Sequence, residues 1–260
     1  MNSSSVDSFL NYENTFGNIA SETLKEETYY DMISDTDLFE YIKSSFENTV
    51  SRGEKYFNFT VTYQNHGPYH TYPITDKVIL KNKDYYDEEL YNEANNYFYG
   101  ISKTDAALAN LVEYIDSRSE PVVLILFGDH MPGLSDNCYN MLGANIDLLT
   151  FEGAENYFET PYIFYANQAA KDALGKDFDE EGETISPMFL MNELFGYLEI
   201  QGPAYLNYMS DVKEELDVIN HSYCAKDGEF LFRWNMTDVA ILNERQNIEY
   251  YLKNLQVKSS

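Results

Sequence analysis

An aspartate and a histidine stand side by side at residues 129 and 130, directly after the apolar run Val122–Phe127 and Gly128. A carboxylate and an imidazole together suit Mn²⁺ or Mg²⁺, with Zn²⁺ a weaker fit. Neighbouring side chains on a strand point to opposite faces, so both bind one ion only if the backbone turns there. Gly128 permits such a turn. The alternative interpretation is an Asp–His pair that is hydrogen-bonded within a loop.

A second polar pair, Asn65 and His66, follows another β-type run, and Gly67-Pro68 favours a turn directly after it. A neutral histidine in such a place binds a metal ion, whereas a protonated one binds an oxygen of phosphate or sulfate. The alternative is a turn in which both side chains bond to their own backbone.

The elements that must position these pairs indicate an α/β fold with a mainly parallel sheet flanked by helices. Strands are predicted at 56–63, 122–127 and 161–166. Helices are predicted at 35–48 and 88–117, and a third from 187 onward. Ligands gather at the carboxyl ends of parallel strands, so His66 is expected to share one cleft with Asp129 and His130.

Composition excludes several classes of partner. The formal net charge is -27, with 17 Lys and Arg against 44 Asp and Glu, which argues against binding nucleic acid. No apolar run reaches the roughly 18 residues that cross a bilayer, and the first residues do not form a signal peptide. Cys138 and Cys224 match no metal-ligand spacing; buried thiols are expected, with one disulfide as the alternative.

Four motifs follow one another along the chain: Ser34-Asp-Thr-Asp-Leu-Phe39, Asn65-His-Gly-Pro-Tyr69, Thr104-Asp105 and Phe127-Gly-Asp-His-Met-Pro132. In this order they resemble the sulfatase-like domain of the lipoteichoic acid synthase and phosphoglycerol transferase family, within the alkaline phosphatase superfamily. Segments 160–165 and 186–190 resemble a later strand and helix of that family. The resemblance covers about residues 34–200, and the ordered set is more specific than any one motif.

The resemblance implies a role for each matching residue. Asp129 and His130 correspond to the family's ligand pair for a catalytic Mn²⁺ or Mg²⁺, and His66, next to Asn65, to the histidine that contacts the substrate phosphate. Family members use a metal-activated threonine to take glycerol phosphate from phosphatidylglycerol through a covalent intermediate. The implied partner is therefore an anionic lipid or glycerol phosphate, and the implied location is extracytoplasmic, at the cell surface.

The match departs from the family at its start, because the family's nucleophile and a further metal-binding glutamate lie well upstream of the Ser34 motif. None of the 33 residues before Ser34 shows a strand followed by a Ser or Thr turn, so no nucleophile is named. We expect residues 1–33 to be a remnant and residues 34–260 to be the C-terminal portion of a sulfatase-like domain. The N-terminal part of the fold and a membrane anchor would then lie in a missing segment.

Three functions remain open on this basis. The first is metal-dependent phosphoglycerol transfer in the cell envelope, with Asp129 and His130 holding a metal ion only weakly because two ligands are fewer than a closed site uses. The second is hydrolysis of another phosphate or sulfate ester by the same type of site. The third is a non-catalytic domain that keeps the fold for binding or assembly.

Overall fold

The computed structural model describes residues 33–81, 87–220, 222–226, 229–232 and 240–258, so the expected remnant at 1–33 lies almost wholly outside the described residues. The chain divides into two compact units. The first comprises residues up to Glu120 together with His130–Thr160, and the second comprises Pro121–Asp129 together with Pro161–Ser260. The predicted boundary between residues 33 and 34 is a different division, which the structure does not test.

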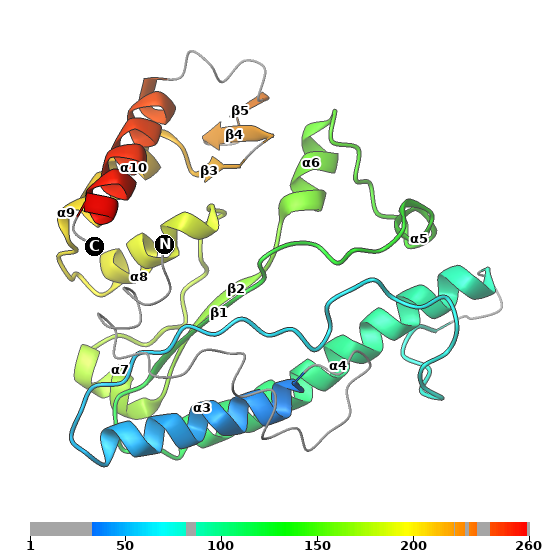
Figure 1. The fold of residues 1–260 in the computed structure, drawn as a ribbon, viewed down its shortest axis with the longest axis horizontal. Coiled ribbons are helices and arrows are strands. Elements are labelled where there is room, and N and C mark those ends of the chain that lie inside the picture. Colours follow the sequence, from blue (N-terminus) through cyan, green and yellow to red (C-terminus); the bar gives the residue numbers. More distant parts are fainter. Residues whose placement is uncertain (1–32, 82–86, 221, 227–228, 233–239, 259–260) are drawn as a thin grey trace. The chain divides into compact units, whose positions relative to one another are not determined.

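The first unit is helical in its regular structure. Its helices are α3 (Asp35–Val50), α4 (Glu88–Asp116), α5 (Asp136–Met141) and α6 (Phe151–Phe158). Helix α3 lies alongside α4 (Figure 1). The two predicted helices of this unit, at 35–48 and 88–117, are thereby confirmed to within two residues at each end.

Local chemistry explains where α3 begins and which face it buries. The Ser34 side chain accepts a hydrogen bond from the backbone N–H of Asp37 at 3.0 Å, which satisfies one of the first amides of the helix. Leu38 and Phe46 are buried, and the Phe46 ring meets the Tyr114 ring of α4 edge-on at 6.2 Å between centroids. Packing of an apolar stripe therefore fixes α3 against α4.

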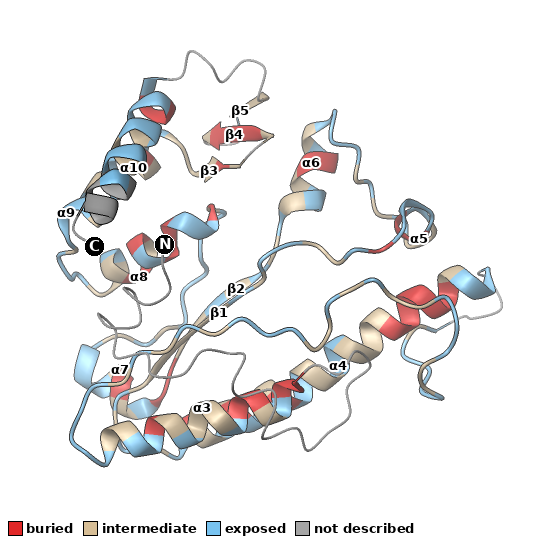
Figure 2. Cartoon of the chain, in the orientation of Figure 1, coloured by how far each residue is buried: buried red, intermediate tan, exposed pale blue. Residues whose placement is uncertain are grey.

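Helix α4 buries two different kinds of residue along its length. Its C-terminal half buries apolar side chains, among them Leu111 and Ile115. Its N-terminal part buries polar ones, and Figure 2 shows buried residues gathered near the start of the helix. These buried polar residues are Asn92, Glu93, Asn95 and Asn96.

The second unit contains the strands and the remaining helices. Its elements are β1 (Val123–Phe127), β2 (Tyr162–Ala166), α7 (Gln168–Leu174), η2 (Pro187–Phe189), α8 (Leu190–Tyr197), α9 (Ala204–Glu215), β3 (Val218–Ile219), β4 (Tyr223–Lys226), β5 (Glu229–Phe232) and α10 (Ala240–Lys258). The predicted strands at 122–127 and 161–166 and the helix expected from 187 are confirmed.

The direction of strand pairing differs from the prediction. Strands β1 and β2 pair antiparallel, with Val123 opposite Ala166 and Phe127 opposite Tyr162, and β3-β4-β5 also form an antiparallel sheet. The α/β class is confirmed, but the expected parallel direction is wrong for β1 and β2. A long segment joins these two strands, and an apolar pattern by itself reports burial rather than direction.

The predicted strand at 56–63 is also not assigned as a strand among the described residues. The aromatic and β-branched side chains that suggested a strand are largely exposed. Phe57 is 66% exposed and Phe59 is 60% exposed. The strand prediction at 56–63 is therefore wrong for the described residues, because β-rich composition does not ensure that the apolar side chains are buried.

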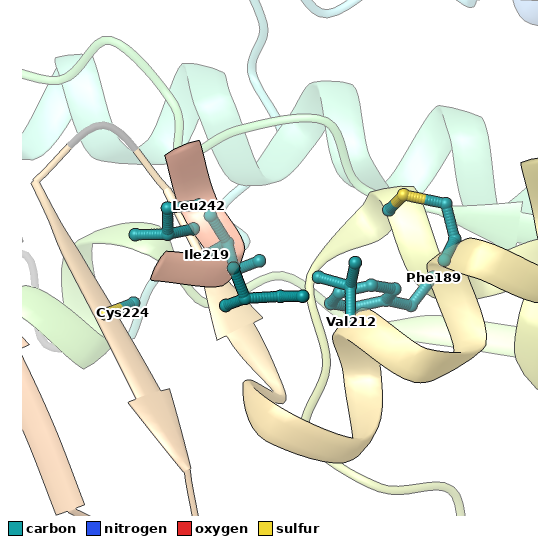
Figure 3. Close-up of a cluster of buried hydrophobic side chains, with 7 residues drawn as sticks. Phe189, Val212, Ile219, Cys224 and Leu242 are labelled. Atoms are coloured by element: carbon teal, nitrogen blue, oxygen red, sulfur yellow. The ribbon is translucent and has the colours of Figure 1, made fainter. Parts of the chain in front are cut away.

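The core of the second unit lies where η2, α9, β3, β4 and α10 meet (Figure 3). Phe189 and Val212 have no exposed surface, and Ile219 and Cys224 are nearly as deeply buried. The Ser186 hydroxyl donates to the Ile219 carbonyl at 2.8 Å and accepts from the Ile219 N–H at 2.6 Å. This pair of bonds ties the start of η2 to β3.

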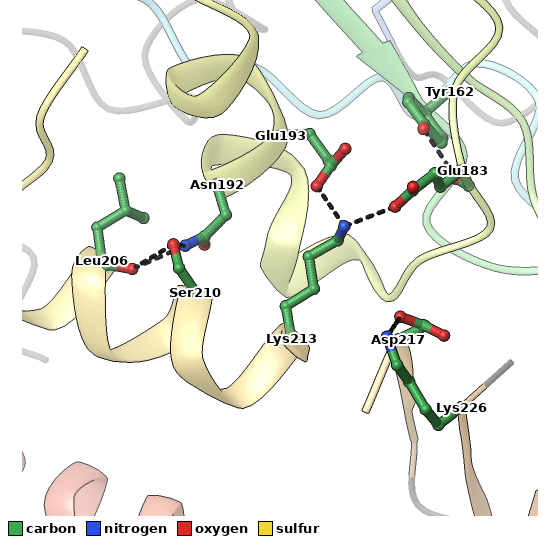
Figure 4. A network of polar contacts seen from close by, with 9 residues as sticks. All are labelled: Tyr162, Glu183, Asn192, Glu193, Leu206, Ser210, Lys213, Asp217 and Lys226. Atoms are coloured by element: carbon green, nitrogen blue, oxygen red, sulfur yellow. Dashed lines mark hydrogen bonds and ion pairs between the residues drawn. The ribbon is translucent and has the colours of Figure 1, made fainter. Parts of the chain in front are cut away.

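A polar network joins further segments of the same unit (Figure 4). The Lys213 ammonium on α9 lies 2.7 Å from carboxylate oxygens of both Glu183 and Glu193. The Tyr162 hydroxyl donates to the Glu183 carbonyl at 2.8 Å. Since the Glu183 side chain is 70% exposed, its ion pair adds little stability. The network mainly orients the segment before η2.

Both cysteines are buried free thiols, as the sequence predicted. Burial and the neighbouring Glu93 carboxylate raise the pKa of Cys138 to about 12, so that thiol is protonated at neutral pH. Within the described ranges, no helix is both long enough and apolar enough to span a membrane.

Candidate functional site

His66 and His130 lie next to each other in the first unit. Their ring centroids are 6.2 Å apart, with the rings nearly perpendicular. Their loops also approach each other, because a Cβ added at Gly67 would lie 3.7 Å from the Gly133 carbonyl oxygen. The two rings thus lie as close together as the sequence predicted, whereas the cleft that they were expected to share with Asp129 stays a prediction. The expected support, a shared sheet edge, is not what the described residues show.

Both rings are oriented by the backbone of the following residue. The His66 Nδ1 is 2.7 Å from the Gly67 carbonyl oxygen, and the His130 Nδ1 is 2.7 Å from the Met131 carbonyl oxygen. A carbonyl oxygen only accepts, so each Nδ1 carries the proton. Nε2 is then the atom that holds the lone pair of a neutral ring, or that donates to an anion when the ring is protonated.

Asp129 lies two residues after the end of β1 and precedes His130 directly in the chain. Its side chain is exposed, and the Gly128 N–H before it donates to the Pro161 carbonyl at 3.0 Å. Asp129 and His130 offer a carboxylate oxygen and an imidazole nitrogen, a donor set that fits Mn²⁺ or Mg²⁺. In the part of the chain that the structure describes, no three His, Cys, Asp or Glu residues are grouped to hold a metal ion. These residues thus supply two ligands.

The side chain of Asn65 faces α4. Its Nδ2 donates to the Tyr97 carbonyl at 3.3 Å, and the Tyr69 hydroxyl donates to the Asn65 carbonyl at 2.8 Å. The amide lies so close to Gly100 that a Cβ added there would be 1.7 Å from the Asn65 Oδ1. These contacts make Asn65 an anchor for the turn that carries His66. Its direct contact with a substrate stays a prediction.

Replacing Gly100 by alanine tests this anchor. In the middle of a helix, alanine normally stabilises by about 1 kcal/mol relative to glycine. Here we expect the opposite sign, a loss of about 1–3 kcal/mol, because the new methyl group displaces the Asn65 amide from its bond to Tyr97. Urea denaturation measures the free energy of unfolding.

Gly196 in α8 provides the matched control, since nothing lies within 4 Å of a Cβ added there. Gly196→Ala should therefore stabilise the protein by a few tenths to about 1 kcal/mol. If both alanine variants proved stabilising, the close packing of Asn65 on α4 would be contradicted.

The Ser34 motif and Thr104 belong to one buried contact. The Thr104 hydroxyl donates to the Asp35 carboxylate at 2.6 Å, and the Asp35 N–H donates to the Gln64 side-chain oxygen at 3.2 Å. Burial raises the pKa of the Asp35 carboxyl, against the lowering effect of the Thr104 hydrogen bond. Asp35 therefore links α3 to α4 and to Gln64, two positions before His66. Asp105, the other residue of the Thr104-Asp105 motif, is exposed.

A set of three asparagines on α4 was not singled out in the sequence. We name Asn92, Asn95 and Asn96 the amide ladder, because their side chains bond to successive backbone groups of residues 70–80. Asn96 Nδ2 donates to the carbonyls of His70 and Tyr72 at 2.8 and 2.9 Å. The other bonds join Asn92 to Thr71 and Asn95 to Lys77, Ile79 and Leu80. The ladder gives a segment without regular structure a fixed course.

A signal for the ladder is present in the sequence. Three asparagines within five positions of a helix are unusual, because the asparagine side chain competes for backbone hydrogen bonds and disfavours helices. Glu93 lies among them and is equally buried. Such a cluster in a confidently predicted helix indicates buried amides that bind another segment.

These features describe an α/β protein in which His66 and His130 lie on adjacent loops of the first unit. The chain belongs to the sulfatase family, whose model matches residues 1–200. The sulfatase-like resemblance stated from the motifs is thereby confirmed.

Two further proteins are similar to the chain. A putative cyclic β-1,2-glucan modification protein of Rhizobium meliloti (strain 1021) is 27% identical over 194 residues, which are 72% of this chain and 28% of that protein. The fold is similar to that of the Streptococcus pyogenes phosphoglycerol transferase GacH, solved in complex with sn-glycerol-1-phosphate. The TM-score is 0.54 at 21% identity, over 88% of this chain and 50% of GacH. The chain thus spans half or less of each relative.

Proposed function

We propose that this chain carries the phosphate-binding and metal-binding loops of a sulfatase-family enzyme that transfers glycerol phosphate. The observation that carries the proposal is the pairing of His66 and His130 at 6.2 Å, each with its Nδ1 bonded to its own loop. Support comes from the family itself and from the similar fold of a phosphoglycerol transferase that binds sn-glycerol-1-phosphate.

The proposed roles follow from the donor types. His66, protonated at both ring nitrogens, would donate from Nε2 to a phosphate oxygen. Asp129 and His130 would hold Mn²⁺ or Mg²⁺ together with ligands beyond these two. When bound, the ion would neutralise phosphate charge, which a chain of net charge -27 otherwise repels. No residue is assigned as nucleophile. The proposed role of the His66 and His130 loops is therefore to bind and orient the phosphate.

The substrate and location follow the same proposal. A glycerol phosphate group donated by an anionic lipid, at the extracytoplasmic cell surface, fits the family resemblance, and a glucan is named for one relative. A non-catalytic binding domain is the second candidate. It is favoured by one observation, that the described residues include no group of three metal ligands.

Binding of sn-glycerol-1-phosphate tests the proposal. We expect heat of binding in calorimetric titrations with Mn²⁺ present, and affinity at least about 10-fold weaker in His66→Ala, since a hydrogen bond to a charged group is lost. His70→Ala is the matched control, because His70 is a neighbouring histidine whose ring stacks on Tyr72. Equal affinity of the parent and His66→Ala would contradict the assignment.

Metal binding provides a separate prediction. Two protein ligands hold an ion less tightly than a closed site, so Mn²⁺ should bind the parent weakly. Asp129→Ala should abolish this binding, whereas Asp105→Ala, which removes an exposed carboxylate on α4, should retain it. Calorimetry with Mn²⁺ alone measures both. Unchanged binding in Asp129→Ala would show that the ion binds elsewhere.

A further inference from the structure

The loop that carries His66 is attached to α4 on both sides of the histidine. Before it, Asn65 Nδ2 donates to the Tyr97 carbonyl at 3.3 Å. After it, Asn96 Nδ2 donates to the His70 carbonyl at 2.8 Å. The position of His66 is therefore set by one turn of α4.

The loop that carries His130 is attached to the same turn. Ser135 donates twice to the buried Glu93 carboxylate, from its backbone N–H at 2.5 Å and from its hydroxyl at 2.7 Å. The Ser135 hydroxyl also accepts from the Cys138 N–H and so begins α5. Nearer to His130, the Tyr139 hydroxyl donates to the Pro132 carbonyl. These bonds connect the loop after His130 to α4 through α5.

Glu93 and Asn96 are three residues apart on α4, so their side chains lie on one face of the helix. One of them holds the His130 loop and the other holds the His66 loop. A helix turn is stiff, so holding both loops on one turn fixes the distance between them more tightly than separate attachments would. Ala94 of α4 and Tyr139 of α5 belong to one cluster of buried apolar residues.

A carboxylate is required at position 93 for chemical reasons. Both Ser135 groups donate, and only a carboxylate offers two acceptor oxygens in this arrangement. An amide of the same size keeps one acceptor oxygen, and the Ser135 hydroxyl would have to turn and accept from its N–H₂ group, which loses the charge-assisted bond. Burying a charge in a chain that is already strongly negative carries a desolvation cost, which two charge-assisted hydrogen bonds offset.

We propose that Glu93 is a positioning residue, which holds the His130 loop on α4 and thereby sets the separation of His66 and His130 that phosphate binding requires. The effect of Glu93 on phosphate binding rests on the proposed function. The separation of His66 and His130 is measurable without any ligand. Glu93 acts through Ser135 and does not touch the substrate.

Histidine NMR provides the measurement, because the chain contains only 4 histidines and their ring signals are assigned by single substitutions. In the parent, ring protons of His66 and His130 should show a nuclear Overhauser effect. We expect Glu93→Gln to remove or strongly reduce it, and to weaken binding of sn-glycerol-1-phosphate by about 10-fold, as for other residues that orient ligand groups. Glu113→Gln, an exposed carboxylate on the same helix, should change neither.

Variants at Ser135 decide the result if Glu93→Gln fails to fold. Ser135→Ala loses the hydroxyl donor and keeps the backbone N–H, so we expect an effect between those of the parent and Glu93→Gln. Ser135→Thr retains the hydroxyl and should show the same ring signals as the parent. A folded Glu93→Gln protein with the parent ring contact and affinity, even if less stable, would overturn the positioning role. If Glu93→Gln loses the ring contact but the parent itself binds no sn-glycerol-1-phosphate, the positioning role of Glu93 stands. The proposed function would then be overturned.

Discussion

Phe189→Ala is expected to lower the free energy of unfolding by about 3–5 kcal/mol. The Phe189 side chain has no exposed surface and packs at the centre of the second unit's core with Val212 and Ile219. Alanine would remove the ring and leave a cavity that the surrounding helices and strands fill only in part. Urea denaturation followed by circular dichroism measures the change.

The control for this variant is Tyr250→Ala on α10, which removes an aromatic ring that is 72% exposed. Such a surface substitution should change stability by no more than about 0.5 kcal/mol. If Phe189→Ala cost no more than Tyr250→Ala, the packing described for the core would be incorrect.

Asn95→Ala is expected to cost about 3 kcal/mol, although alanine is the better helix former. The Asn95 amide accepts from the N–H groups of Ile79 and Leu80 and donates to the Lys77 carbonyl. Its removal leaves three backbone groups without these partners. Besides lower stability, hydrogen exchange of the Ile79 and Leu80 amides should become faster.

Asn48→Ala on α3 serves as the comparison, because Asn48 is exposed and lies in a helix as well. Alanine should be neutral or slightly stabilising there. Asn95→Asp adds a finer distinction, since it keeps an acceptor for Ile79 and Leu80 but loses the donor to Lys77. Parent-like exchange rates in Asn95→Ala would contradict the attachment of the 77–80 segment to α4.

The elements whose burial is apolar were predictable from the sequence. Leu111 and Ile115 follow a helical spacing within α4, and Ser34 is a typical cap at the start of α3; periodicity and capping are local properties of a sequence. The direction of β1 relative to β2 was not predictable in the same way. Pairing depends on the segment between two strands and on which face meets the core, and neither is a local property.

The candidate site, like the fold, was predictable from the sequence only in part. The sequence predicted that His66 and His130 would lie close together, and it did so from a parallel sheet that the structure does not show for β1 and β2. It did not predict that α4, rather than a sheet edge, would hold them, because the helical apolar pattern gives no sign that the polar residues Glu93 and Asn96 are buried. Their burial follows from bonds to segments 26 and 42 positions away, which no helical period reports.

The amide ladder has a consequence for how this region responds to acidity and salt. Carboxamides do not ionise, so the bonds from Asn92, Asn95 and Asn96 to the backbone neither strengthen nor weaken as protons are added. Ion pairs on the surface are screened by salt, whereas these uncharged bonds are not. Acid protonates carboxylates and so reduces the negative charge of a chain with 44 acidic residues. The course of the segment from His70 to Leu80 should then stay the same while the charge around it changes.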